Sequence, residues 1–289
     1  MTADAGLARP GYLDHWGLAE APFLLDPDPR FAYERADHQE GLARVLFGIS
    51  QLGGLTLITG EVGSGKTLLC QTLARLLDGR GFRVATVANP PRTPAALLAA
   101  LLAAAGGEPA GGSAARLARL LRARLAAISE DGGRAVLVID EAQRLAPRAL
   151  DEVRLLTNAG DAGPGAPVAL LGQPELARQV ERMPQVAQRV VVRYHLGPMS
   201  AEEVAAYADH RARVAGARRP VLSPRAAAAV HAETGGVPRL VNMLLANALF
   251  VAAGRGEERI DADTIRDLAE DRRISERAAR DGGDGGSPA

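Results

Sequence analysis

The feature that most restricts the fold of this chain is a glycine-rich segment, Gly60-Glu-Val-Gly-Ser-Gly-Lys-Thr67. It follows an apolar run at 55–59 that is typical of a buried strand, and it opens a helical pattern at 66–77. The segment matches G-x-x-x-x-G-K-[ST], the pattern of a loop whose main-chain N–H groups surround phosphates. Its glycines permit positive φ, and the helix that follows directs its positive dipole end toward the same anion. The sequence therefore predicts a nucleotide-phosphate loop between a strand and a helix.

Lys66 is the only lysine of the chain, and every other member of its 34 basic residues is arginine. A lysine supplies a compact, flexible point charge, which fits the outer phosphates better than a planar arginine fork. We expect Lys66 to bind these phosphates and Thr67 to offer its hydroxyl to Mg²⁺. The nucleotide-binding residues predicted in this segment are Gly60, Glu61, Val62, Gly63, Ser64, Gly65, Lys66, Thr67 and Leu68.

A second apolar run, Val136-Leu-Val-Ile-Asp-Glu141, ends in two carboxylates about 70 residues after the loop. Ligands of open α/β sheets collect at the C-terminal edge of the parallel strands, where these two acids would lie. Asp140 is the expected partner of Mg²⁺ through water. Glu141 is expected to orient and activate the attacking water.

Short apolar runs alternate with helical patterns through the first two thirds of the chain. Besides the two runs above, strands are predicted at 82–88, 168–171 and 190–195, and helices at 93–105 and 147–157. This alternation predicts an α/β fold with a P-loop parallel sheet sandwiched by helices.

The pattern changes near Ser200, after which we find helices only. The predicted organisation is a flexible N-terminus at 1–10, an ATPase domain at 11–198, a small all-helical lid at 199–271, and a charged, glycine-rich and disordered tail at 272–289.

P-loop kinases, GTPases and AAA+ ATPases share the loop and the paired acids, and three further features favour the last class. Gln173 ends a predicted strand, where its amide could sense the γ-phosphate or the water. Arg189, with Arg193 as the alternative, stands where it could reach a neighbouring subunit's nucleotide as an arginine finger. Arg239 lies on the first turn of a lid helix and could report the nucleotide state to the lid.

These residues resemble the AAA+ ATPases of the ExeA/GspA type (general secretion pathway protein A), including MshM-like and exosortase-associated members. The resemblance covers roughly residues 12–268. Its most specific strings are Gly172-Gln-Pro-Glu-Leu176 and Tyr194-His-Leu-Gly-Pro198. It also includes Asp140-Glu-Ala-Gln143 and Gly235-Gly-Val-Pro-Arg-Leu240.

The resemblance implies ATP hydrolysis by a ring or other homo-oligomer, with an inner-membrane or envelope-assembly protein as partner. The chain would act in a secretion, pilus or exopolysaccharide system, in the cytoplasm or attached to the inner membrane through that partner. The longest members carry a membrane span and a peptidoglycan-binding domain, for which this sequence has no counterpart, so we do not expect direct peptidoglycan binding. The resemblance further suggests Phe31, Tyr33 or His38 as contacts to the adenine.

Two other function classes stay open. A DNA-associated ATP switch of the transposition-regulator or initiator type is the alternative, although nucleic acid is not the favoured partner. The predicted lid carries 9 arginines against 10 acids over 201–270, and the whole chain has a net charge of +0, so a polycationic nucleic-acid coat is excluded. A basic helix at 113–128, with Arg116, Arg119, Arg122 and Arg124, could contact DNA, acidic lipid headgroups or an acidic partner, or simply form a solvated face. A small-molecule P-loop kinase is the third class, and it would have no use for Arg189 or Arg239.

Overall fold

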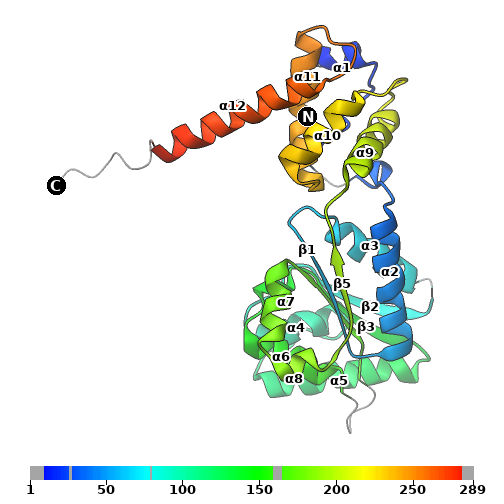
Figure 1. The fold of residues 1–289 in the computed structure, drawn as a ribbon. Coiled ribbons are helices and arrows are strands. Elements are labelled where there is room, and N and C mark those ends of the chain that lie inside the picture. The colour runs from blue at the N-terminus through cyan, green and yellow to red at the C-terminus, as the bar shows by residue number, and fades with distance from the viewer. Residues whose placement is uncertain (1–9, 26–27, 79, 159–164, 282–289) are drawn as a thin grey trace, which may run out of the picture. The chain divides into compact units, whose positions relative to one another are not determined.

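The computed structural model describes residues 10–25, 28–78, 80–158 and 165–281. It divides into two compact units, Arg35–Gly197 and the remainder, Met1–Glu34 with Pro198–Ala289. We call the first the sheet unit and the second the helical unit, and each is described by itself (Figure 1).

A five-stranded parallel sheet forms the centre of the sheet unit, in the order β2-β3-β4-β1-β5. The strands are β1 (Leu55–Gly60), β2 (Phe82–Val87), β3 (Arg134–Ile139), β4 (Val168–Gly172) and β5 (Val190–Leu196). β1 and β4 are buried over their whole length, as expected for inner parallel strands that are covered on both faces. The predicted P-loop α/β fold is confirmed, and each predicted strand is present.

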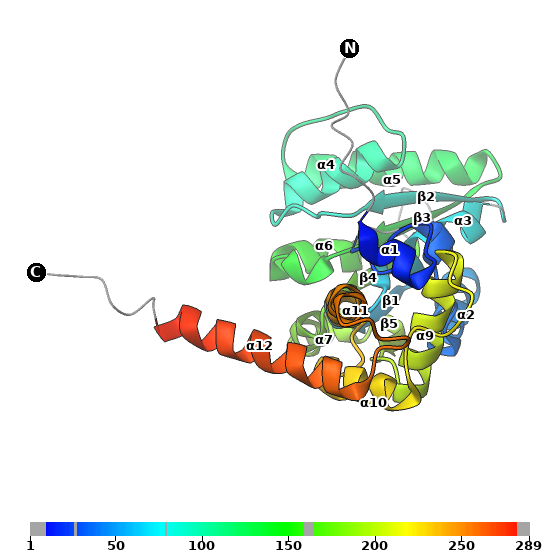
Figure 2. The same ribbon diagram turned by 90° about the horizontal axis from the view of Figure 1, so that it is seen from above.

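Helices cover both faces of this sheet (Figures 1 and 2). One face packs on α2 (Ala36–Phe47) and α3 (Lys66–Asp78) through a core that includes Ile58, Val136 and Val138. The other face packs through Leu57, Leu137 and Ile139. Its helices are α4 (Pro94–Ala104), α5 (Ala114–Glu130), α6 (Pro147–Leu156), α7 (Pro174–Glu181) and α8 (Pro184–Ala187). Successive residues of a strand thus point to opposite faces of the sheet and pack into the two different cores.

Two short helical connections complete the sheet unit. A short π-helix, η2 (Gly48–Leu52), leads into β1 at the N-terminal edge of the sheet, and a 3₁₀ turn, η3 (Ala142–Arg144), follows β3 at the C-terminal edge. α2, α7 and α8 were not predicted from the sequence. α2 carries charged residues among its apolar ones, and α7 and α8 are only two turns and one turn long, shorter than the window over which a helical pattern is recognised.

The helical unit consists of α9 (Ala201–Val214), α10 (Pro224–Thr234), α11 (Pro238–Gly254) and α12 (Ala262–Asp281), with α1 (Gly11–Trp16) and the turn η1 (Pro29–Phe31). Ser200 begins α9 with a capping box that involves Glu203. In the core of the helical unit, Leu18 and Phe23 pack with apolar residues of all four long helices.

Residues 11–34 were expected to belong with the ATPase domain, but the structure groups them with the helical unit. Hydrogen bonds explain the grouping. Trp16 Nε1 donates to the Leu249 carbonyl at 2.8 Å, and Arg211 Nε donates to the Pro22 carbonyl at 2.6 Å. Leu18, fully buried in the same core, adds apolar contact.

The C-terminal segment also differs from the expectation. α12 continues to Asp281, whereas disorder was expected from residue 272. Arg273 Nη1 donates to Glu233 Oε2 of α10 at 3.2 Å, which fastens this part of the helix. The remaining tail, 282–289, and the N-terminal residues 1–9 lie outside the described residues. Within the described part of the chain, none of the helices combines the length and apolarity that a bilayer crossing requires.

Candidate active site

The glycine-rich loop connects β1 to α3 with a backbone that only glycine adopts easily. Gly63 and Gly65 have φ of 82° and 97°. A Cβ on Gly65 would also lie 2.5 Å from Nε2 of His38, an atom that lies 3.2 Å from the Ser64 carbonyl oxygen. The loop is therefore closed on one side by His38, and its second glycine cannot carry a side chain without displacing it.

Lys66 begins α3 and is only 5% exposed. Its Nζ donates to the carbonyl oxygens of Gly60 and Glu61, both at 2.8 Å. Burial lowers the pKa of the Lys66 ammonium, although the nearby charges of Glu141, Asp140 and Glu61 act in the opposite direction. A single cation is thus held inside the loop, beside the acids that follow β3.

Thr67 and Asp140 connect the loop to the end of β3. The Thr67 hydroxyl donates to Asp140 Oδ2 at 3.1 Å, and Asp140 Oδ1 accepts the Glu141 N–H at 2.8 Å. Asp140 is 4% exposed, and its burial raises the pKa of its carboxyl group. A hydroxyl and a carboxylate in contact are hard oxygen donors of the kind that suits Mg²⁺, which usually takes one or two protein ligands and completes its shell with phosphate and water.

Glu141 has φ of 53°, and no other non-glycine among the described residues has positive φ. A left-handed residue of this kind costs about 1 kcal/mol or more and persists where its surroundings hold it. Gln143 does so, because its Nε2 donates to Glu141 Oε2 at 2.7 Å. The backbone turn and the amide together fix the direction of the Glu141 carboxylate.

Gln143 is a site residue that the sequence reading did not select, although it lies within the string Asp140–Gln143. Its Oε1 accepts the Gln173 N–H at 3.1 Å, so one amide bridges the ends of β3 and β4. A Cβ on Gly172 would lie 2.7 Å from this Oε1, which explains the glycine there. It is the main-chain N–H of Gln173, rather than the side-chain amide proposed as a sensor, that joins the network.

The remaining loop residues differ in burial. Ser64 Oγ is buried and has no hydrogen-bond partner among the described residues, so the loop holds a polar atom that is available to an oxygen ligand. Val62 is 49% exposed, and Leu68 is half-buried on the first turn of α3.

The three predicted arginines lie outside this network. Arg189 is exposed at the start of β5, where its carbonyl accepts the Leu55 N–H at 2.9 Å, so it lies at the N-terminal edge of the sheet. Arg193 lies within β5, and its Nη1 is 4.0 Å from Glu181 Oε1. Arg239 is exposed on the first turn of α11, in the helical unit.

Of the aromatic residues suggested for adenine, two pack into the helical unit. Phe31 is 4% exposed beneath the Arg211 guanidinium, and the Tyr33 ring lies 5.9 Å from that of Tyr207. His38, in contrast, lies beside the glycine-rich loop.

The basic helix of the sequence reading, α5, uses its arginines mostly internally. Arg116 donates to the Gly111 carbonyl, Arg122 to the Leu155 carbonyl and Arg124 to the Ala105 carbonyl. These bonds orient the three side chains but do not neutralise them. Arg116 and Arg119 are exposed, so α5 keeps a positively charged face.

Comparisons with known proteins agree with this architecture. An AAA domain family matches residues 49–180. General secretion pathway protein A of Aeromonas hydrophila is 40% identical over 254 residues, which make up 86% of this chain and 46% of that protein. The chain therefore spans about half the length of the curated relative that it matches.

Solved structures share the fold at low identity. Cdc6p of Pyrobaculum aerophilum has a TM-score of 0.65 at 17% identity, covering 83% of this chain and 67% of that one. The ORC2 protein of Aeropyrum pernix, in ADPNP–ADP complexes, has a TM-score of 0.62 at 19% identity, covering 86% and 70%. The RuvB Holliday junction branch migration motor of Thermotoga maritima has a TM-score of 0.52 at 17% identity, covering 82% and 69%.

Proposed function

We propose, from the premise that this chain is an AAA protein of the general secretion pathway protein A type, that it binds ATP with Mg²⁺ and hydrolyses it. The 40% identity to general secretion pathway protein A confirms the family that the sequence motifs indicated. ATP hydrolysis by this chain is our proposal. The observation that carries the proposal is the contact between the loop and the paired acids, with Thr67 Oγ1 at 3.1 Å from Asp140 and buried Lys66 beside them.

In this proposal, each group of the network has one task. The main-chain N–H groups of the glycine-rich loop surround the phosphates, and Lys66 supplies a positive charge to the outer ones. Thr67 and Asp140 would hold Mg²⁺, which neutralises charge on the phosphate oxygens.

Glu141 is proposed as the group that orients and activates water. Its carboxylate is held by Gln143 and by the left-handed backbone, so it is positioned before the substrate binds. Gln173 is still proposed as a sensor of the γ-phosphate or the water, because only its main-chain N–H is bonded to Gln143 and its side chain has no hydrogen-bond partner among the described residues.

We further propose that the active form is a homo-oligomer in which Arg189 acts on a neighbour's nucleotide. Arg193 is the alternative, but Arg189 is better suited, since no described residue accepts a hydrogen bond from its guanidinium. Arg239, at the start of α11, is proposed to report the nucleotide state to the helical unit.

The relative's name supports a role for this chain in a secretion system. Action in a pilus or exopolysaccharide system, and a place in the cytoplasm or at the inner membrane through a partner, are the wider proposal. A DNA-associated switch has less support, because the net charge of the chain is +0 and residues 201–270 carry 9 arginines against 10 acids. Salt-sensitive binding of duplex DNA in the presence of ATP would reverse this preference.

Calorimetry and ATP turnover on the purified chain, with two variants, test the proposal. Lys66→Ala should lose nucleotide binding, whereas Glu141→Gln should bind ATP with unchanged affinity and hydrolyse it about 10²–10³-fold more slowly. Full turnover by Glu141→Gln would remove Glu141 from its role, and absence of ATP binding by the wild type would overturn the proposed function.

A further inference from the structure

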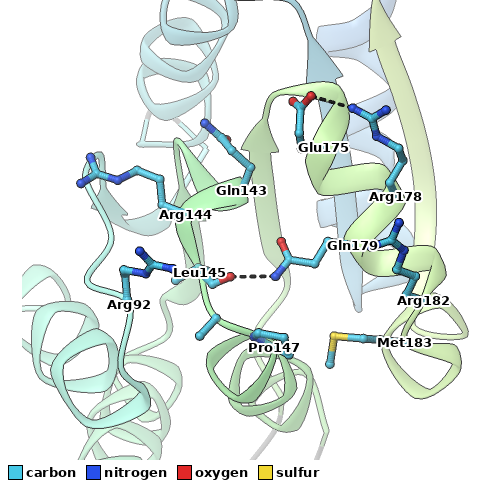
Figure 3. A pocket seen from close by; sticks show the side chains of 11 residues that line it. Arg92, Gln143, Arg144, Leu145, Pro147, Glu175, Arg178, Gln179, Arg182 and Met183 are labelled. Atoms are coloured by element: carbon cyan, nitrogen blue, oxygen red, sulfur yellow. Dashed lines mark hydrogen bonds and ion pairs between the residues drawn. The ribbon is translucent and has the colours of Figure 1, made fainter. Parts of the chain in front are cut away.

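A pocket of ≈ 910 Å³ lies beside the candidate active site, within the sheet unit (Figure 3). Its walls come from three segments: the connection after β2, the turn η3 with the start of α6, and α7 with the residues that follow it. The lining residues are Arg92, Gln143, Arg144, Leu145, Ala146, Pro147, Glu175, Arg178, Gln179, Arg182 and Met183. Its volume is within the range of ligand-binding pockets, and no residue of the nucleotide loop lines it.

Positive charge dominates the rim of this pocket. Four arginines and one glutamate line it. Glu175 pairs with Arg178 at 2.6 Å, while Arg144 donates to a neutral amide oxygen, Asn89 Oδ1, at 3.1 Å. Within the described part of the chain, no carboxylate pairs with Arg92, Arg144 or Arg182. Figure 3 shows the guanidinium groups on opposite walls of the pocket, so an occupant between them would meet cations from both sides.

The floor is largely apolar and contains no aromatic ring. Leu145, Pro147 and Met183 lie between the two arginine walls, together with Gln179, whose amide donates to the Leu145 carbonyl at 2.7 Å (Figure 3). Nucleic-acid sites that hold single strands combine cations with aromatic platforms for the bases, and this pocket lacks such a platform among its lining residues. Guanidinium forks instead match carboxylates, and a small aliphatic floor accepts aliphatic side chains. This combination favours a peptide segment that carries both acidic and aliphatic side chains.

Gln143 connects the pocket to the chemistry. It lines the pocket and also donates to Glu141 Oε2 at 2.7 Å, while the adjacent Arg144 forms the wall. Gln143 and Arg144 lie on the same short turn, η3, so a ligand that drew Arg144 away from Asn89 would act on the turn that holds the Gln143 amide. The hydrogen bond from Gln143 would then link occupancy of the pocket to the orientation of the Glu141 carboxylate.

We propose that this arginine-walled pocket binds an acidic, aliphatic segment of a partner protein, and that its occupancy changes the rate of ATP hydrolysis through Gln143. The rate coupling rests on the proposed ATPase function, but the binding does not. Gln143 acts here as a positioning residue, because it reaches the reaction through Glu141.

The experiment uses the full chain and a labelled short peptide in which Glu and Leu alternate, with fluorescence anisotropy as readout. The wild type should bind this peptide, and the double variant Arg178→Glu/Arg182→Glu should bind it about tenfold or more weakly. Arg119→Glu, at an exposed position of α5 outside the pocket, is the matched charge control and should bind as the wild type does. A peptide with Lys in place of Glu should not bind.

The second readout is ATP turnover with and without the peptide. Peptide should change kcat of the wild type, whereas Gln143→Ala should still bind peptide but show no peptide-dependent change in kcat. Equal peptide affinity of the wild type and the Arg178→Glu/Arg182→Glu variant overturns the site, and so does a preference for a single-stranded oligonucleotide that is lost in this variant. A peptide-dependent kcat that survives in Gln143→Ala overturns the coupling. If the chain binds the peptide but hydrolyses no ATP, the peptide site is supported and only the proposed ATPase function is contradicted.

Discussion

The functional side chains at the two edges of the parallel sheet differ in burial and in whether this chain provides their hydrogen-bond partners. At the C-terminal edge, Lys66 and Asp140 are 5% and 4% exposed and are held by hydrogen bonds within the same unit. At the N-terminal edge, the exposed Arg189 has no side-chain partner among the described residues. β1 spans the distance between these edges with six residues, roughly 17 Å at about 3.3 Å per residue.

The C-terminal edge therefore holds the groups that a molecule uses for its own nucleotide, whereas the N-terminal edge holds an arginine that could act on the nucleotide of another molecule. Arg189 lies too far along the strand direction to reach the glycine-rich loop of its own sheet unit. An arginine there can act on a phosphate only if that phosphate belongs to a second molecule, which is the arrangement we propose. The following predictions test the two edges in order of decreasing expected effect.

The largest effect is expected at the N-terminal edge. Arg189→Ala should lower kcat by about 10³-fold while ATP binding stays unchanged, since an arginine finger stabilises charge only in the transition state. Arg193→Ala, on the same strand, is the control and should have a much smaller effect. Steady-state turnover across a range of protein concentrations measures both.

Mixing variants makes this prediction sharper. Lys66→Ala has an impaired loop but an intact Arg189, and Arg189→Ala has the reverse. If the arginine acts in trans, a mixture of the two should hydrolyse ATP faster than the sum of the separate proteins. A mixture that is only additive contradicts the proposed arrangement.

At the C-terminal edge, Gly65→Ala should weaken ATP binding by about 100-fold. The added Cβ would meet His38 at 2.5 Å and would require φ of 97° at a non-glycine residue. Gly81→Ala is a matched control, because Gly81 has φ of 79° and nothing within 4 Å of the added Cβ. Calorimetric titration with ATP should show normal affinity for the control, and normal affinity for Gly65→Ala would contradict the prediction.

Gln143→Ala should reduce kcat by about tenfold with little change in KM, because it releases Glu141 without touching the phosphate loop. Gln179→Ala is the control. Gln179 lies nearby and donates to the Leu145 carbonyl at 2.7 Å, but it does not contact Glu141. Equal kcat values for the two variants would show that the bond from Gln143 does not position the carboxylate.

The smallest effect concerns stability. Burial raises the pKa of the Asp140 carboxyl, so the folded protein holds this proton more tightly than the unfolded chain does. The free energy of unfolding therefore falls as pH rises from the ordinary carboxyl range through the raised pKa. Asp140→Asn removes this dependence and should raise the free energy of unfolding by about 1 kcal/mol at pH 7.

Urea unfolding at pH 7 and at mildly acidic pH checks this, and the gain should shrink at the lower pH. Asp131→Asn, an exposed position after α5, should change the stability by no more than about 0.5 kcal/mol at either pH. A loss of stability in Asp140→Asn at pH 7 would mean that its hydrogen bonds outweigh the cost of burying the charge.

Local patterns in the sequence were sufficient for the sheet and for the loop. The apolar run before Gly60 and the run before Asp140 predict both strands, whereas the order of the strands in the sheet is known only from the structure. The position of residues 11–34 could not be predicted, because it depends on bonds such as that from Arg211 to Pro22, which are 189 residues apart in the chain. The same is true of Gln143 and of the arginine-walled pocket. Their partners come from segments that only the folded sheet brings together.

Lys66, the one lysine, also has a practical consequence. An amine-directed acylating reagent can modify only this side chain and the terminal amine. The lowered pKa leaves more of its amine neutral at a given pH, and the neutral form is the nucleophile. Because the side chain is 5% exposed, the rate of acylation would report how often the loop opens. Protection by added triphosphate could then be followed by mass spectrometry at one position.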